Sequence, residues 1–152
     1  MRLNRRILVR IFGLSILSIF IPLNNLFSSA KKIINSKLSD QQKNIMFNEG
    51  TERPFSSKLL NEKRKGFYHC ANCGNKLFAS NSKFDSGTGW PSFSEALPGA
   101  FKTKTDYSFG MERVEYHCAK CGAHHGHVFN DGPRESGKRF CSNGLCLIFK
   151  PE

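Results

Sequence analysis

The chain has 152 residues, enough for one domain with a modest core, and its 39% apolar and 23% charged residues are typical of a globular protein rather than a disordered one. A formal net charge of +11 could attract nucleic acid or anionic lipid, but no run of Lys and Arg with interleaved aromatic residues is present. We therefore expect a basic solvated surface and no nucleic-acid partner.

The first thirty residues have the layout of a secretory signal peptide, with a basic head over residues 1–10 and an uncharged apolar run over residues 11–23. Residues 28–30 supply small side chains for cleavage, and the paired Arg5 and Arg6 also resemble a twin-arginine export signal. The run is shorter than the roughly 20 apolar residues of a membrane span. We expect cleavage and a bacterial periplasmic protein that meets the membrane only during export. An uncleaved segment that anchors the protein is the alternative.

Residues 31–37 have the composition of a polar, basic linker, and one domain is expected over residues 38–152. Ser39 and Gln42 match a capping box, which predicts a short helix over residues 40–48. From residue 51 onward, Gly-rich turns separate short aromatic and β-branched runs. The domain is therefore predicted to be mainly β.

Two Cys-x-x-Cys turns, each followed directly by a glycine, predict one zinc site with the ligands Cys70, Cys73, Cys118 and Cys121. Four thiolates are the closed tetrahedral set of a structural zinc site. No coordination position is left for His69 and His117, which precede the turns. The alternative is two disulfides or two redox pairs. Neither pair opens a helical pattern, where a redox pair normally lies.

Cys141 and Cys146 are the two cysteines that are not assigned to the zinc site, so they are the candidates for a reactive thiol. If the chain around Cys141 is extended, Arg139, Cys141 and Asn143 share one face. A guanidinium beside a sulfur favours the nucleophilic thiolate, and the Asn143 amide could orient a substrate oxygen or the sulfur. Cys146 lies among apolar residues, where a free cysteine packs as a small hydrophobe. Cys141 is therefore the predicted nucleophile.

Further motifs resemble the methionine sulfoxide reductase B family, in the family's order and from about residue 38 to the C-terminus. They occupy residues 50–56, 74–78, 84–93, 126–133 and 139–143, with both Cys-x-x-Cys turns in place. The resemblance implies two antiparallel sheets, called a β-tent, with a zinc clamp. It also implies that the protein reduces methionine R-sulfoxide, free or within oxidised proteins.

The resemblance also implies roles for residues outside the clamp. Trp90 matches an aromatic wall for the substrate methyl group, and it lies on a turn, where sites tend to be. The family's site histidines and flanking residues correspond to His124, His127, Arg139 and Asn143. Considered without the family, His124, His125 and His127 are an alternative second metal site. Asp131 is interpreted as a turn former.

The implied mechanism is thiolate attack by Cys141 on the sulfoxide sulfur, which leaves a sulfenic acid. His127, assisted by His124, is the expected proton donor. Many family members carry their resolving cysteine at the position that is Thr88 in this chain. We therefore expect an external reductant, either a small thiol or a thioredoxin-like donor.

Cys146 is the alternative resolving cysteine. A two-residue hairpin turn at Asn143 and Gly144 would place it opposite Cys141, whereas a straight segment would put the two on opposite faces. Two other functions stay open. One is another thiol-handling enzyme of this fold, such as a handler of glutathione–aldehyde adducts. The other is a basic zinc-ribbon module that binds nucleic acid with steep salt dependence. We expect a monomer.

Overall fold

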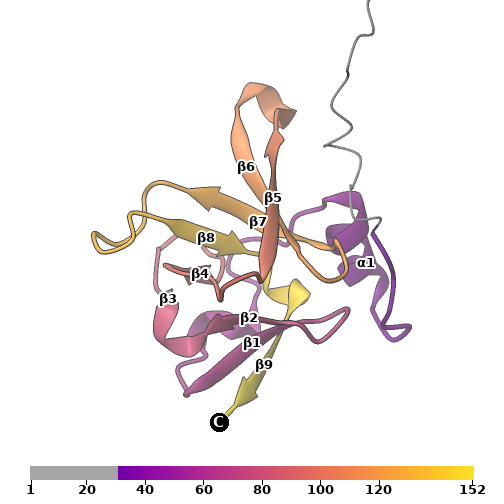
Figure 1. Ribbon diagram of the computed structural model, residues 1–152, viewed down its shortest axis with the longest axis horizontal. Helices are drawn as coiled ribbons and strands as arrows, with labels where there is room; N and C mark the ends of the chain where they lie inside the picture. Colours follow the sequence, from indigo (N-terminus) through magenta and orange to yellow (C-terminus); the bar gives the residue numbers. More distant parts are fainter. Residues whose placement is uncertain (1–30) are drawn as a thin grey trace, which may run out of the picture.

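The computed structural model describes residues 31–152 (Figure 1). The predicted signal peptide over residues 1–30 lies outside the described residues. Within the described part, one short α-helix accompanies two antiparallel sheets, so the predicted mainly β fold is confirmed. No helix between residues 31 and 152 combines the length and apolarity that a membrane crossing requires.

Helix α1 (Asp40–Asn48) is capped as the sequence predicts. The Ser39 hydroxyl accepts a hydrogen bond from the Gln42 backbone N–H at 3.2 Å, and the Gln42 side chain accepts one from the Ser39 N–H at 2.9 Å. Ile45 and Met46 are buried. The Gln42 amide also donates to the Leu145 carbonyl at 2.9 Å, so the capping residue anchors the helix to the chain that follows Cys141.

Nine strands form the two sheets of residues 31–152. The three-stranded sheet has the order β2-β1-β9, with β1 (Gly66–Cys70), β2 (Lys76–Ala79) and β9 (Leu147–Pro151). The six-stranded sheet has the order β3-β4-β8-β7-β6-β5, with β3 (Lys83–Phe84), β4 (Ser92–Phe93), β5 (Phe101–Asp106), β6 (Arg113–Cys118), β7 (His124–Phe129) and β8 (Arg139–Ser142). In Figure 1, β5 and β6 extend beyond the other strands.

Aromatic side chains from both sheets build the core between them. Phe78 of β2 stacks on Phe93 of β4 with ring centroids 4.0 Å apart, and Tyr68 of β1 meets Phe93 edge-on at 4.9 Å. Tyr116 of β6 is also fully buried. Such pairs add to the free energy of burial, so the aromatic runs seen in the sequence are the contact between the sheets.

The chain passes from one sheet to the other at residues 143–146. Gly144–Cys146 forms a 3-10 turn, in which the Cys146 N–H donates to the Asn143 carbonyl at 3.0 Å. Strand β8 pairs with β4 and β7, whereas β9 pairs with β1. The hairpin that would place Cys146 opposite Cys141 is therefore not formed.

Residues 31–37, predicted as a linker, lie against both Cys-x-x-Cys turns. The Lys32 N–H donates to the Cys121 carbonyl at 3.1 Å, and the Ile34 N–H donates to the Asn72 side chain at 2.8 Å. The Asn72 amide donates back to the Lys32 carbonyl at 2.7 Å. The segment thus bridges the two turns.

Candidate active site and metal centre

The four cysteines predicted to bind zinc converge on one point. Their sulfur atoms all lie within 4.8 Å of one another, with 3.8 Å between Cys70 and Cys121 and 3.6 Å between Cys73 and Cys118. A disulfide requires about 2.05 Å, and these cysteines are free. Zinc–sulfur bonds of about 2.3 Å in a tetrahedron place sulfurs about 3.8 Å apart. The cluster therefore fits one metal ion and not two disulfides.

The glycine after each Cys-x-x-Cys pair closes its turn. The Gly74 N–H donates to the Cys70 carbonyl and the Gly122 N–H to the Cys118 carbonyl, both at 2.8 Å. The two glycines have φ angles of 70° and 71°, in the left-handed region that glycine adopts without steric cost. The two turns are therefore locally equivalent.

A row of side chains crosses the six-stranded sheet on the face opposite the aromatic core. Cys141 of β8 pairs with Ser92 of β4 on one side and with His127 of β7 on the other. The row continues through Glu115 of β6 to Lys104 of β5. Directly opposed residues of antiparallel strands point to the same face. The fold thus brings a thiol, an imidazole and a carboxylate into one line.

A β-bulge in β7 places two histidines on this face. The pairing of β6 with β7 shifts register between Tyr116 and His117, which leaves His125 as an extra residue. Successive residues of a regular strand alternate between faces. His124 and His127 are three positions apart and share a face only because of this extra residue. Their ring centroids lie 5.7 Å apart.

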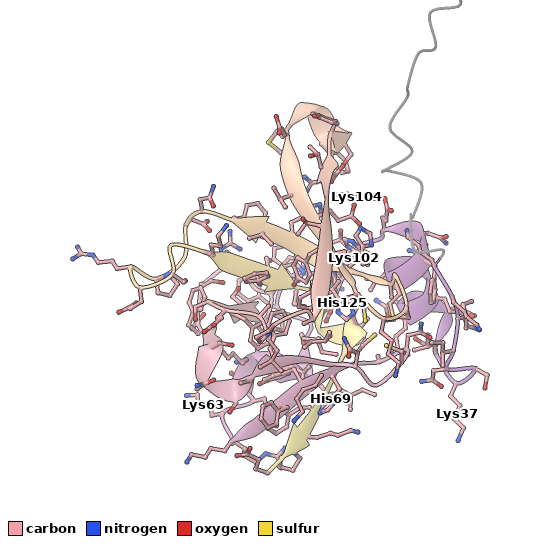
Figure 2. All side chains as sticks on the ribbon, in the orientation of Figure 1. Lys37, Lys63, His69, Lys102, Lys104 and His125 are labelled. Atoms are coloured by element: carbon pink, nitrogen blue, oxygen red, sulfur yellow. The ribbon has the colours of Figure 1, made fainter. Side chains whose placement is uncertain are left out.

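His125 itself points into the core (Figure 2). Its ring centroid lies 5.6 Å from that of Phe101, and neither ring nitrogen has a hydrogen-bond partner. Burial lowers the pKa of His125 to about 3, so the ring is neutral near pH 7. The alternative metal site at His124, His125 and His127 is therefore wrong, because the bulge turns His125 away from the other two.

Cys141 is partly buried, and two side chains act on its thiol. Burial raises the pKa of Cys141, while the Arg139 guanidinium and the Thr88 hydroxyl lower it without fully offsetting burial. The Thr88 hydroxyl is held in turn by the Ser86 hydroxyl at 2.9 Å. Arg139 acts in the direction expected from the sequence, and Thr88 adds a second stabilising contact to the thiolate.

The backbone of Cys141 is fixed from the neighbouring strands. The Tyr116 hydroxyl donates to the Cys141 carbonyl at 3.2 Å. A Cβ atom at Gly126 would lie 1.9 Å from that carbonyl oxygen, so only glycine permits this approach of β7 to β8. The nucleophile therefore sits on a rigid strand.

Arg139 is held in place by Asp131, which was interpreted from the sequence as a turn former. Asp131 accepts two hydrogen bonds from the Arg139 guanidinium, at 2.8 Å and 2.7 Å. The guanidinium also lies over the Phe129 ring, 4.4 Å from its centroid. A bidentate pair of this kind fixes orientation as well as charge.

His127 is oriented from the turn end of the β5–β6 hairpin. Its Nε2 atom lies 2.8 Å from Oδ2 of Asp106, and Arg113 contacts the same oxygen at 2.7 Å. Burial lowers the pKa of His127, although Asp106 acts in the opposite direction. His127 is therefore mainly neutral near pH 7, with a carboxylate placed to stabilise its protonated form.

Glu115 links the histidines of this face. Its Oε1 atom is contacted by Nδ1 of His124 and lies 3.0 Å from Nε2 of His117, while Oε2 lies 3.1 Å from the Lys104 ammonium. Burial opposes ionisation, but the two imidazoles hold the pKa of Glu115 well below its usual range. His124 is thus positioned by a buried carboxylate.

Trp90 and Asn143 are connected through Glu52. The Trp90 indole N–H donates to the Glu52 carbonyl at 2.9 Å, and the Glu52 N–H donates to the Asn143 side-chain oxygen at 2.8 Å. The Asn143 amide donates to the His125 carbonyl at 3.1 Å. Asn143 therefore uses both ends of its amide to join two segments of backbone.

Cys146 lies in the core, away from solvent. It is completely buried at the crossing between the sheets, and burial raises its pKa well above the usual value. Cys141 is more exposed, and its environment favours the thiolate more strongly. The two remaining cysteines therefore differ in the way that the sequence suggested.

Four residues near the site received no role from the sequence: Glu52, Thr88, Asp106 and Glu115. The alternation of Arg113, Glu115 and His117 along one strand was a usable signal, because a period of two places them on one face. Asp106 had no comparable signal, since only the pairing of β5 with β6 brings it near His127.

Comparison with known proteins identifies the family. The SelR domain model matches residues 38–151. The chain is similar to the peptide methionine sulfoxide reductase MsrB of Methanosarcina barkeri, with 49% identity over 116 residues, 76% of this chain and 82% of that protein. The chain belongs to the MsrB family. This is a family of oxidoreductases that act on sulfur.

Other MsrB proteins are similar to the same extent. That of Photorhabdus laumondii is 50% identical over 117 residues, 76% of this chain and 86% of that protein. That of Agrobacterium fabrum is 47% identical over 116 residues, with the same two coverages. Among solved structures, the crystal structure of the Mis18 'Yippee-like' domain has a TM-score of 0.49 at 16% identity, over 59% of this chain and 98% of that chain. This last similarity is too weak to indicate a function.

Proposed function

We propose that this protein reduces methionine R-sulfoxide, in oxidised proteins or as the free amino acid, with Cys141 as its nucleophile. Membership of the MsrB family supports the reaction. The observation that carries the assignment of Cys141 is its direct pairing with His127, with both residues partly exposed on the face of the sheet opposite the aromatic core. A thiolate and a proton donor side by side are what sulfoxide reduction requires.

In the first step the Cys141 thiolate attacks the sulfoxide sulfur while the sulfoxide oxygen takes up a proton. The oxygen is transferred to Cys141, which is oxidised to a sulfenic acid, and the sulfoxide is reduced to methionine. Arg139 and Thr88 favour this step because both lower the pKa of Cys141 against the effect of burial.

His127 supplies the proton, assisted by His124. With its Nε2–H donated to Asp106, Nδ1 of His127 is the atom that carries the proton to the sulfoxide oxygen. The Asp106 carboxylate stabilises the imidazolium, as in other His–carboxylate pairs. Glu115 orients His124 in the same manner.

Trp90 provides the apolar contact for the methyl group of the sulfoxide. Its indole N–H is satisfied by the Glu52 carbonyl, so the ring orientation is fixed before substrate binds. Asn143 acts through this connection as a positioning residue, since its amide is engaged with backbone groups.

Two external thiol groups regenerate Cys141. The first attacks the sulfenic sulfur and releases water, and the second reduces the mixed disulfide, so that the donor leaves as a disulfide. A small thiol or a thioredoxin-like protein fits this role. Thr88 stands where a resolving cysteine is usual, and Cys146 is buried at the crossing between the sheets.

The clamp cysteines hold one Zn²⁺ in this proposal. The ion, when bound, supplies a structural crosslink between the ends of β1 and β6 and no catalytic chemistry. The segment before residue 31 directs export to the periplasm, on the evidence of its basic head and apolar run. The mature protein acts as a monomer.

Turnover of resolved R- and S-sulfoxides tests the proposal, first with dithiothreitol and then with a thioredoxin-like donor. We expect reduction of the R form only. Cys141→Ser should abolish it with unchanged zinc content, while the matched variant Cys146→Ser keeps it with dithiothreitol. Turnover of a glutathione–aldehyde adduct in place of the sulfoxide, or robust turnover by Cys141→Ser, would overturn the assignment.

A further inference from the structure

A second group of metal-binding side chains lies beside the clamp, on β6 and β7. Glu115, His117 and His124 each offer one ligand atom, and the three atoms lie within 4.8 Å of one another. The side chains of Glu115 and His124 are 2% exposed and that of His117 is 12% exposed. Two imidazoles and a carboxylate are a ligand set that zinc uses in open sites.

The hydrogen bonding of His117 shows which of its nitrogens is free for a metal. Nδ1 lies 3.3 Å from the Gly122 carbonyl, which can only accept, so Nδ1 carries the hydrogen in the neutral ring. Nε2 then presents a lone pair toward Oε1 of Glu115 at 3.0 Å, and this buried nitrogen makes no aligned hydrogen bond. Two lone pairs that face each other repel, so a positive charge between them, either a proton on Nε2 or a metal ion, stabilises this approach.

The first Cys-x-x-Cys turn provides a natural comparison. His69 precedes it as His117 precedes the second, and its Nδ1 contacts the Gly74 carbonyl at 3.0 Å. The turn therefore fixes the same tautomer in both histidines. Two residues earlier, however, β1 carries Phe67 where β6 carries Glu115. Figure 2 shows His69 on the three-stranded sheet, and only the second turn has a carboxylate facing the free nitrogen.

We propose that Glu115, His117 and His124 form a second site for a divalent transition metal such as Zn²⁺, with a fourth position open. The donation of Nδ1–H from His117 to a backbone carbonyl is the support that metal-bound histidines normally have. Lys104 occupies Oε2 of Glu115 and also contacts Glu49, so Oε1 is the oxygen left for the metal.

The site has a consequence for the reaction proposed above. A metal bound there would hold His124, whose ring lies 5.7 Å from that of His127, and would withdraw it from the proton-donating pair. The bound metal thus acts as an inhibitor of turnover. Metal binding itself can be measured without turnover, so it is separable from the proposed activity.

Zinc titration, measured by calorimetry and elemental analysis, tests the second site. The starting protein already carries the clamp zinc. It also carries Cys141→Ser, which removes the nearby thiol as a ligand. We expect two zinc ions per chain. His117→Gln should keep the clamp zinc and weaken the second equivalent by more than about 100-fold, since a ligand is lost. The matched variant His69→Gln should keep both.

Glu115→Gln serves as the second variant, and the melting temperature and the clamp zinc report whether each variant is folded. A parent protein that binds only one zinc overturns the proposal. So does a folded His117→Gln or Glu115→Gln variant that still binds two ions with unchanged affinity. Equal loss in His69→Gln and His117→Gln would place the second ion elsewhere and would also overturn it.

Discussion

Five of the six cysteines occupy two contrasting regions, four in the clamp and Cys141 on the face of the six-stranded sheet opposite the core, while Cys146 is buried in the core. In the clamp, two equivalent turns each present two sulfurs, and the backbone hydrogen bonds that close each turn join residues four or five positions apart. On the face, Cys141 has neighbours from β4 and β7 and from the loop that carries Thr88. The clamp is therefore built locally, while the reactive environment depends on the register of several strands.

The largest expected effect is removal of one clamp ligand. Cys121→Ser should unfold the domain, because metal binding in such sites contributes about 10–16 kcal/mol and most domains have only about 5–15 kcal/mol of stability. Zinc analysis and circular dichroism measure both consequences together. Cys141→Ser is the control, and it should retain zinc and a cooperative melt. A folded, metal-free Cys121→Ser protein would contradict the structural role of the clamp.

A second effect concerns the bulge that lies between the two regions. His125→Leu should stabilise the protein by about 1–3 kcal/mol, because it removes a buried ring whose nitrogens have no partners. Urea or thermal unfolding measures the change. His69→Leu, at the other turn, should bring no such gain, since its ring hydrogen-bonds the Gly74 carbonyl.

The pH dependence of that gain has a definite sign. The pKa of His125 is about 3 in the folded protein, below the ordinary value of 6.5, so the unfolded chain binds the proton more tightly. The free energy of unfolding is therefore unaffected above pH 6.5 and falls as the pH drops from 6.5 toward 3. His125→Leu lacks this loss, so its advantage over the parent should widen as the pH is lowered from 7 to 5. A constant difference would show that the pKa of His125 is the same in the folded and the unfolded chain.

The contrast between the regions also explains what the sequence could predict. The helix cap, the mainly β fold, the four metal ligands and the buried character of Cys146 follow from local patterns. The position of His124 on the same face as His127 does not, because a period of two predicts the opposite and only the bulge reverses it. Asp106 was also out of reach, since only strand pairing brings it near His127, whereas the alternation of Glu115 with His117 along one strand was a usable signal.

A smaller effect is expected from Thr88→Val on the outer face. The substitution removes a hydrogen bond to the Cys141 sulfur, so the pKa of Cys141 should rise and its alkylation by iodoacetamide should shift to higher pH. At pH 7 the rate should fall by roughly tenfold, which corresponds to about 1.4 kcal/mol, the lower end of the range for one hydrogen bond to a charged group. The clamp zinc should be unaffected. Unchanged alkylation would mean that Arg139 alone determines the reactivity of the thiol.

The smallest effect is expected from Cys146→Ser, which tests whether Cys146 takes part in recycling. The 3-10 turn at Gly144–Cys146 carries the chain into the other sheet, so no strand pairing holds Cys146 against Cys141. Turnover with dithiothreitol should be unchanged, and turnover with a thioredoxin-like donor should also be unchanged if external thiols reduce the sulfenic acid directly. Peroxide-treated protein should then show a sulfenic acid at Cys141 by mass spectrometry.

A Cys141–Cys146 disulfide in the oxidised parent, together with a Cys146→Ser variant that stalls only with the protein donor, would contradict this expectation. That result would require the residues 143–146 to leave their turn during the cycle, because the folded arrangement keeps Cys146 buried at the crossing between the sheets.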